Sequence, residues 1–146
     1  CRLLSQRLAD SVGRHAMTRH EIRLEHGRWS VTCFIGYHAD ADTDEISRAL
    51  EGIGCTGEAL LEARRHLAKD SKDRGLTYSN VRRRESVVAV GRSGDLASGV
   101  NTIAHELLHV VQHVCEQDGI SMTGEEACYI MGELCERVFV NIFHNH

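Results

Sequence analysis

Apolar residues recur at intervals of three and four over residues 96–115, which is the spacing of an α-helix that buries at least one face. A second stretch with the same periodicity covers residues 125–143, and a short polar loop around Asp118 and Gly119 separates the two. Two helices joined by so short a loop form an antiparallel pair. In the first stretch apolar side chains occur almost all the way round the helix, which predicts a central helix.

The rest of the chain contains both strand-like and helical patterns. Residues 28–38 are rich in β-branched and aromatic side chains and predict a strand, with 21–27 as its hairpin partner. Further helices are predicted at 2–12, 39–54 and 56–68, and two further strands at 76–79 and 85–92. Strands and helices grouped in this order favour an α+β fold, in which helices cover a small mixed or antiparallel sheet.

The composition limits the classes of protein to which the chain can belong. Its 146 residues, without repeats or linkers, predict a single domain over 1–146. Lys and Arg number 17 against 21 Asp and Glu, and this net charge of −4 argues against nucleic acid as a partner. We expect no membrane partner, because no apolar run approaches the roughly 18 residues of a membrane span.

Six cysteines lie mostly in apolar strand and helix patterns, without a C-x-x-C pair. Free cysteines in such positions behave as small apolar residues, so we expect them to be buried and reduced. Reduced cysteines, together with the lack of a signal peptide, predict a cytoplasmic protein, although the start at Cys1 rather than Met leaves a trimmed N-terminus open.

The sequence His105-Glu106-Leu107-Leu108-His109 lies inside the first long helical pattern. Residues four apart on a helix share a face, so both imidazoles can bind one Zn²⁺ ion. Glu106 follows the first histidine directly, where its carboxylate can act as a general base toward water. Buried in a central helix, the three residues would need partners, which a metal ion supplies. The alternative is a polar trio on the solvent face of an amphipathic helix.

A catalytic zinc site requires three protein ligands. His113 continues the row of His105 and His109, but it lies about 12 Å from His105 along a straight helix, too far to share the ion, so we expect it beside the site or at the surface. Glu125 and Glu126 open the next helix, which would carry them back beside the motif. Either can complete a His/His/Glu set, and alternatively both are acidic residues of a first helical turn, favoured by the helix dipole.

These residues resemble the zincin superfamily of metallopeptidases, in particular the gluzincins, whose third ligand is a glutamate. The strand ESVVAVGR and the helices NTIAHELLHVVQHV and GEEACYIMGEL are similar to a minimal gluzincin core, which places the metal-binding core at about residues 76–140. Together with the preceding TYSNVRRR, this segment is also similar to small uncharacterised proteins of gut bacteria and their phages.

The resemblance implies His105 and His109 as zinc ligands, Glu106 as the base, and a glutamate of the following helix as the third ligand. It favours Glu125 over Glu126, because the fourth residue after Glu125 is Tyr129, whose hydroxyl can orient a ligand. It also implies that ESVVAVGR forms the sheet edge that binds an extended substrate.

The sequence therefore predicts a zinc metallopeptidase that acts on a peptide or protein substrate. The first alternative is a non-catalytic module that retains the zincin core for zinc binding or protein interaction. The second is a metal-free helical interaction domain in which the motif is fortuitous. Glu106 favours the enzyme, because a purely structural metal site does not need this residue.

Overall fold

In a computed structural model of the chain, which describes residues 16–69 and 72–144, four strands form one mixed sheet in the order β1-β2-β4-β3. β2 and β4 are the parallel central strands, and β1 and β3 are antiparallel strands at the two edges. The strands are β1 (Thr18–Arg23), β2 (Ser30–Tyr37), β3 (Gly75–Asn80) and β4 (Glu85–Gly91).

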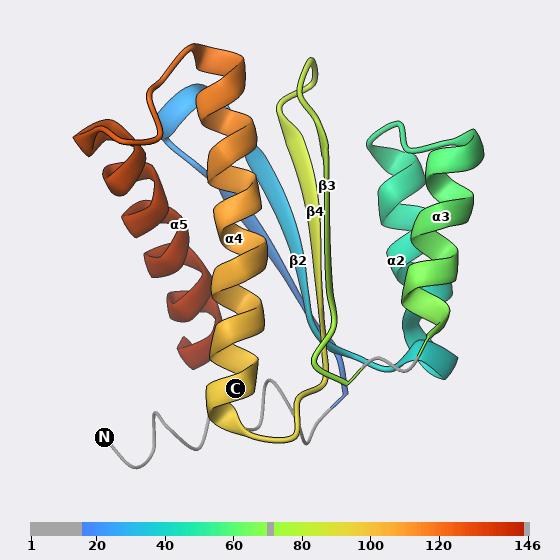
Figure 1. Cartoon of the computed structure of the whole chain (residues 1–146). Coiled ribbons are helices and arrows are strands. Elements are labelled where there is room, and N and C mark those ends of the chain that lie inside the picture. The colour runs from blue at the N-terminus through green and yellow to red at the C-terminus, as the bar shows by residue number, and fades with distance from the viewer. Residues whose placement is uncertain (1–15, 70–71, 145–146) are drawn as a thin grey trace.

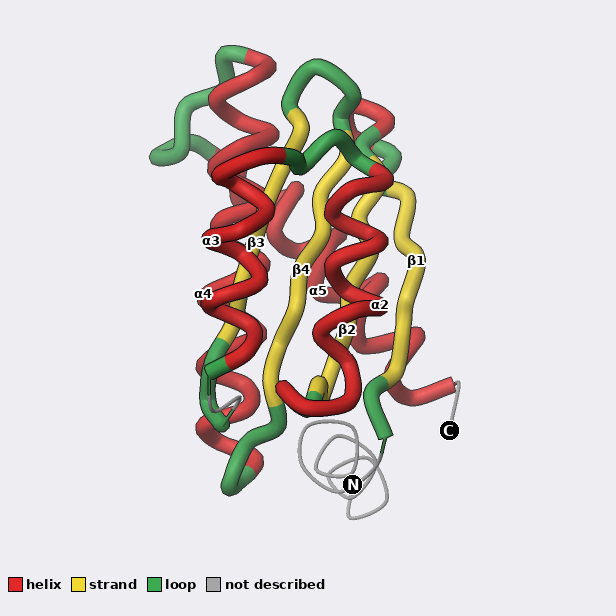
Figure 2. The backbone as a smooth tube through the Cα atoms, turned by 90° about the vertical axis from the view of Figure 1, so that its right-hand side faces the viewer, coloured by secondary structure: helices red, strands yellow, loops and turns green. Residues whose placement is uncertain are grey.

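Two helix pairs cover the two faces of this sheet (Figure 1). Figure 2 shows the strands side by side, with the first helix pair in front of them and the second behind. The first pair is α2 (Ala39–Gly52) and α3 (Gly57–Ala68), and the second is α4 (Leu96–Asp118) and α5 (Glu125–His144). The predicted α+β fold is thus confirmed, and the predicted N-terminal helix at 2–12 lies outside the described residues.

Separate apolar cores lie on the two sides of the sheet. The alternation of side chains along a strand explains how the apolar run of β4 supplies both of them. Val88 and Val90 point into the larger core beneath α4 and α5, whereas Val87 and Ala89 point into the smaller core beneath α2 and α3. β4 is therefore buried on both faces, as its almost continuous apolar sequence indicates.

The structure corrects the expectation that ESVVAVGR forms a substrate-binding edge. β4, which this segment forms, pairs with β2 on one side and with β3 on the other, so its backbone groups are occupied. The edge strand beside α4 is instead β3, whose only partner among the described strands is β4. The hydrophobic pattern indicated a buried strand but held no information about which strand pairs with it.

Local signals account for both ends of α4. The side chain of Asp95 accepts a hydrogen bond from the backbone nitrogen of Ser98 at 2.8 Å, which caps the first turn and lowers the pKa of Asp95. Gly119 ends the helix in the left-handed conformation, with a φ of 67°, which a glycine adopts without strain. These ends determine how far α4 extends beyond the motif.

The five described cysteines are unpaired, as predicted. Cys33, Cys55 and Cys115 are buried, whereas Cys128 is exposed and Cys135 is half-buried, so the expected burial holds for three of the five. Burial raises the pKa of the Cys33 thiol to about 12, which keeps it unreactive. No helix within the described residues has the length and apolar character needed to cross a membrane.

Arg84, in the turn between β3 and β4, holds the far end of α4. Its guanidinium donates to the two carboxylate oxygens of Asp118 at 2.6 and 3.1 Å, and to the carbonyl oxygen of Gly27 at 3.2 Å. The hydrogen bonds from Arg84 lower the pKa of Asp118. Arg84 therefore joins three separate segments of the chain.

Replacing Asp118 by asparagine is expected to lower the urea midpoint of unfolding at neutral pH. Because the folded state depresses the pKa of Asp118, its contribution is complete above the unfolded pKa of about 3.9 and is lost as the pH falls through the folded pKa. The difference in urea midpoint between wild type and Asp118→Asn should therefore become smaller in acid. Asp44→Asn is the control, because its ion pair with Arg64 is exposed. If the difference in midpoint between wild type and Asp118→Asn did not change with pH, the stabilising role of the ionised Asp118 carboxylate would be contradicted.

Candidate metal centre

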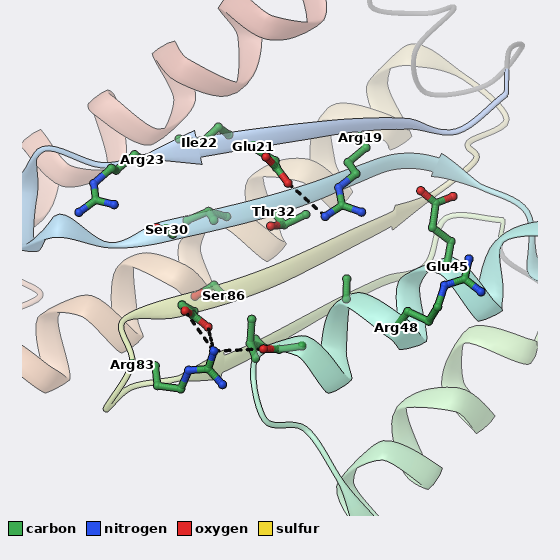
Figure 3. Close-up of a pocket in the computed structure, with 15 residues that line it drawn as sticks. Arg19, Glu21, Ile22, Arg23, Ser30, Thr32, Glu45, Arg48, Arg83 and Ser86 are labelled. Atoms are coloured by element: carbon green, nitrogen blue, oxygen red, sulfur yellow. Dashed lines mark hydrogen bonds and ion pairs between the residues drawn. The ribbon is translucent and has the colours of Figure 1, made fainter.

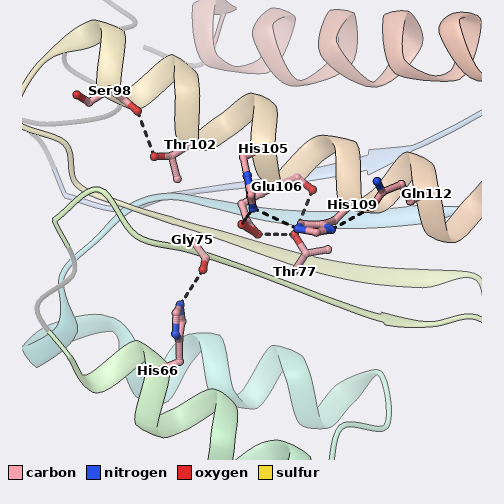
Figure 4. A network of polar contacts seen from close by, with 9 residues as sticks. All are labelled: His66, Gly75, Thr77, Ser98, Thr102, His105, Glu106, His109 and Gln112. Carbon is pink, nitrogen blue, oxygen red and sulfur yellow. Dashed lines mark hydrogen bonds and ion pairs between the residues drawn. The ribbon is translucent and has the colours of Figure 1, made fainter. Parts of the chain in front are cut away.

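The polar residues of the motif lie on the side of α4 that faces β3 (Figure 4). His105, Glu106 and His109 offer donor atoms that all lie within 4.8 Å of one another. Among the described residues this is the one cluster of three His, Cys, Asp or Glu side chains with such an arrangement. Helical spacing accounts for it, since residues four apart share a face and the intervening glutamate lies beside them.

The two imidazoles lie within hydrogen-bond distance of each other, and a metal ion bound by both would hold them at a similar separation. Their Nε2 atoms lie 3.2 Å apart. Two nitrogens that bind one tetrahedral zinc ion at about 2.0–2.1 Å are about 3.3 Å from each other. His105 is 65% exposed and His109 is half-buried, so this position is accessible from solvent.

Gln112 orients the ring of His109. The amide oxygen of Gln112 lies 3.2 Å from Nδ1 of His109 and accepts the hydrogen bond from that nitrogen. With the proton on Nδ1, Nε2 keeps its lone pair directed toward His105. A bound histidine ligand commonly has such a partner on its other nitrogen.

Glu106 is 5% exposed, and its two carboxylate oxygens have different surroundings. Oε2 accepts a hydrogen bond from Oγ1 of Thr77 at 2.7 Å, whereas Oε1 lies 3.7 Å from Nε2 of His105. A buried carboxylate is costly unless it is paired or hydrogen-bonded. Thr77 meets that need at one oxygen, and the other oxygen faces the histidine nitrogens.

β3 supplies site residues that sequence reasoning missed. Gly75, Thr77 and Ser79 share the side of β3 that faces α4, because alternate residues of a strand point the same way. A Cβ atom at Gly75 would lie 2.6 Å from Cγ of Glu106, so the absence of a side chain allows the strand to lie against Glu106. The alternation of small and hydroxyl residues in GLTYSN was the available signal, but it did not indicate which helix they face.

Alternate backbone groups of β3 point away from β4, toward the outer edge of the sheet. The nitrogen of Gly91 donates to the oxygen of Arg74 at 2.7 Å, so even-numbered residues of β3 bond to β4 and odd-numbered ones point outward. Nε2 of His66 bonds the outward oxygen of Gly75 at 2.8 Å (Figure 4). Thr77 and Ser79 are the next outward-facing residues along this edge.

His113 lies at the end of a chain of hydrogen bonds that starts in the core. Nε1 of Trp29 donates to Oγ of Ser86 at 2.7 Å, the hydroxyls of Ser86 and Ser79 lie 2.7 Å apart, and Ser79 contacts Nδ1 of His113 at 2.6 Å. An indole can only donate, so when each hydroxyl donates once, Nδ1 of His113 accepts. Burial, followed by the charge of His109, lowers the pKa of His113. His113 lies beside the cluster, which is one of the two positions expected for it.

The structure does not bring Glu125 or Glu126 to the cluster. Both are exposed in the first turn of α5, where Glu126 pairs with His26 at 3.5 Å. α5 begins beside the end of α4, and about 14 Å of helix separates that end from His109. The motif also faces β3, whereas α5 lies on the other side of α4 (Figure 4). Glu125 is therefore separated from the histidines in two ways: it lies near the far end of α4, and on a different side of that helix.

A polar groove of about 770 Å³ lies on the opposite face of the sheet, between β1, β2 and α2 (Figure 3). Its charges largely compensate one another: Arg19 pairs with Glu21 at 3.1 Å, and Arg83 pairs with Glu85 at 3.2 Å. None of the histidines of the cluster lines it. This groove and the candidate metal centre are thus separate features.

Comparisons of the chain with protein-family models, with curated proteins and with solved structures find no match.

Proposed function

We propose that the chain is a zinc-dependent peptidase in which His105 and His109 hold the ion and Glu106 acts as the general base. The observation that carries this proposal is the 3.2 Å approach of the two Nε2 atoms beside a buried carboxylate. When bound, zinc supplies Lewis acidity that polarises a carbonyl oxygen and makes water more acidic. Imidazole nitrogens are ordinary zinc ligands, and the distance between the two Nε2 atoms is compatible with a tetrahedral ion.

Glu106 performs the proton transfer in this proposal. Its Oε1 faces the histidine nitrogens, so a water molecule between them lies within reach of this oxygen. The carboxylate takes a proton from that water as the water oxygen bonds to the carbonyl carbon, and it gives the proton to the amine nitrogen as the C–N bond breaks. The low exposure of Glu106 favours this transfer, because few bulk water molecules compete for the same oxygen.

The outer edge of β3, beside which no other described strand lies, favours a peptide as the substrate. An extended peptide can add to an exposed strand edge through its backbone groups. The outward N–H and C=O of Thr77 belong to the same residue whose side chain contacts Glu106, so a peptide paired there runs past the base. β3 thereby takes the role that the sequence assigned to ESVVAVGR.

Elemental analysis tests the metal part of the proposal. We expect about one zinc per chain in the wild type and loss of this zinc in His109→Ala, because one imidazole alone binds zinc weakly. His66→Ala is the matched control and should keep its zinc, since His66 lies outside the cluster. A wild-type protein without zinc, both as purified and after reconstitution, would contradict the proposal.

A peptide-library digest tests the reaction itself. Hydrolysis should appear with the zinc-loaded wild type, stop on addition of a chelator and return when zinc is restored. A library that remains intact with fully loaded protein would refute the peptidase activity and leave only metal binding.

One observation favours a non-catalytic zinc-binding module as the second candidate. Within the described residues, the cluster contains two imidazoles and one carboxylate, whereas a catalytic site requires three ligands besides the base. In this alternative, Glu106 itself binds the ion. Zinc affinity in Glu106→Gln separates the two candidates: it is retained if Glu106 is the base and falls if Glu106 is a ligand.

A further inference from the structure

Thr77 connects the edge strand to the side chain of Glu106 (Figure 4). Its Oγ1 lies 2.7 Å from Oε2 of Glu106 and 3.1 Å from the backbone oxygen of the same residue. A threonine hydroxyl has one proton to donate, and a carboxylate is a stronger acceptor than a peptide carbonyl. The shorter contact is therefore the principal hydrogen bond, and it anchors Oε2 to β3.

This hydrogen bond determines which carboxylate oxygen faces the histidines. A glutamate side chain has three rotatable bonds, so its carboxylate turns freely unless contacts hold it. Thr77 holds Oε2, and Gly75 lies so close that a Cβ there would come within 2.9 Å of Cδ and 3.1 Å of Oε1. With one oxygen bonded and the adjacent strand closely packed, Oε1 is left on the side of His105.

We propose that Thr77 is a positioning residue, whose hydroxyl orients the carboxylate of Glu106 so that Oε1 faces the histidine pair. The proposal rests on the proposed function, because it concerns the placement of the same base. In this proposal β3 has two roles. The backbone of Thr77 lies at the outer edge, where a peptide can pair, and the side chain of Thr77 holds the base. Thr77 would thus position both the paired peptide, through its backbone, and the base, through its side chain.

The test compares two substitutions of Thr77 with a control on α4. Thr77→Val keeps the shape of the side chain and removes the hydroxyl, whereas Thr77→Ser keeps the hydroxyl. Thr102→Val is the matched control, because the hydroxyl of Thr102 bonds the backbone oxygen of Ser98, away from Glu106. For each variant, kcat and KM are measured with a peptide that the wild type cleaves, and the zinc content of the protein is measured separately.

We expect Thr77→Val to lower kcat about 10- to 100-fold, the range that misplacement of a reacting group produces, with KM and zinc content unchanged. Thr77→Ser and Thr102→Val should stay close to the wild type. An unchanged kcat in Thr77→Val would overturn the proposal. An equal loss in Thr77→Ser would overturn it as well, because the effect would then come from the packing of β3 rather than from the hydroxyl.

Crystal structures of the zinc-loaded wild type and Thr77→Val provide a readout that does not depend on activity. The wild type should show one conformation of Glu106, and Thr77→Val should show a turned carboxylate or several conformations. A single unchanged conformation in Thr77→Val would overturn the positioning role. If the wild type binds zinc but cleaves no peptide, the proposed function fails, while these two structures still decide the role of Thr77.

Discussion

Glu106→Gln is expected to keep its zinc and to lose about 100- to 10,000-fold in kcat on a peptide that the wild type cleaves. Glutamine has nearly the same shape as glutamate, and its amide oxygen can still accept the hydrogen bond from Thr77. A neutral amide, however, takes no proton from water at neutral pH. The loss therefore isolates the proton transfer from the packing of the side chain.

Glu116→Gln is the matched control for this experiment. Glu116 lies on the same helix, is exposed and is outside the cluster, so its replacement should leave hydrolysis close to the wild-type rate. The kinetics are paired with zinc analysis of each protein. Retention of wild-type hydrolysis by Glu106→Gln would contradict the role of Glu106 as the base.

Leu107→Ala is expected to destabilise the protein by about 2–5 kcal/mol, the usual range for a leucine removed from a packed core. Leu107 is 1% exposed and belongs to the larger core, between α4 and the sheet. Its neighbour Leu108 is 42% exposed, so Leu108→Ala should change the stability by no more than about 0.5 kcal/mol. The two leucines form a matched pair within the motif.

Urea unfolding measures this difference, with a chelator present so that zinc binding does not contribute to the apparent stability. Equal losses in the two variants would show that α4 is buried on both sides, contrary to its packing on one face of the sheet. A loss in Leu108→Ala alone would mean that another side of α4 packs against the sheet, and would contradict the contact between Glu106 and Thr77 of β3.

Helices and strands were predictable because their signals are local. The strand predicted at 85–92 is β4 (Glu85–Gly91), and the helix predicted at 39–54 is α2 (Ala39–Gly52). Both follow from periodicity within a short segment, which depends on backbone geometry alone. The pairing of β4 with β3 depends on segments beyond those windows, and for that reason ESVVAVGR was assigned to the wrong place in the sheet.

In the candidate site, too, only the part that depends on local spacing could be predicted from the sequence. His105 and His109 meet because helical spacing brings them together wherever the helix packs. The loop was correctly predicted around Asp118 and Gly119, but Glu125 was nevertheless expected beside the histidines; because α4 ends at Asp118, the start of α5 lies beside that end rather than beside the motif. The length of a helix beyond a motif decides which residues of the next helix lie opposite it.

The sequence by itself determined the α+β grouping, the long helix with its motif, and the shared face of His105 and His109. Only the tertiary structure decided what lies against that face, because the partners come from a strand far away in the sequence. Thr77 is 29 residues from Glu106, yet its hydroxyl bonds the carboxylate, and the bare backbone of Gly75 leaves room for the same side chain. Periodicity defines the faces of a helix, whereas the packing of distant elements selects which face is buried and what it contacts.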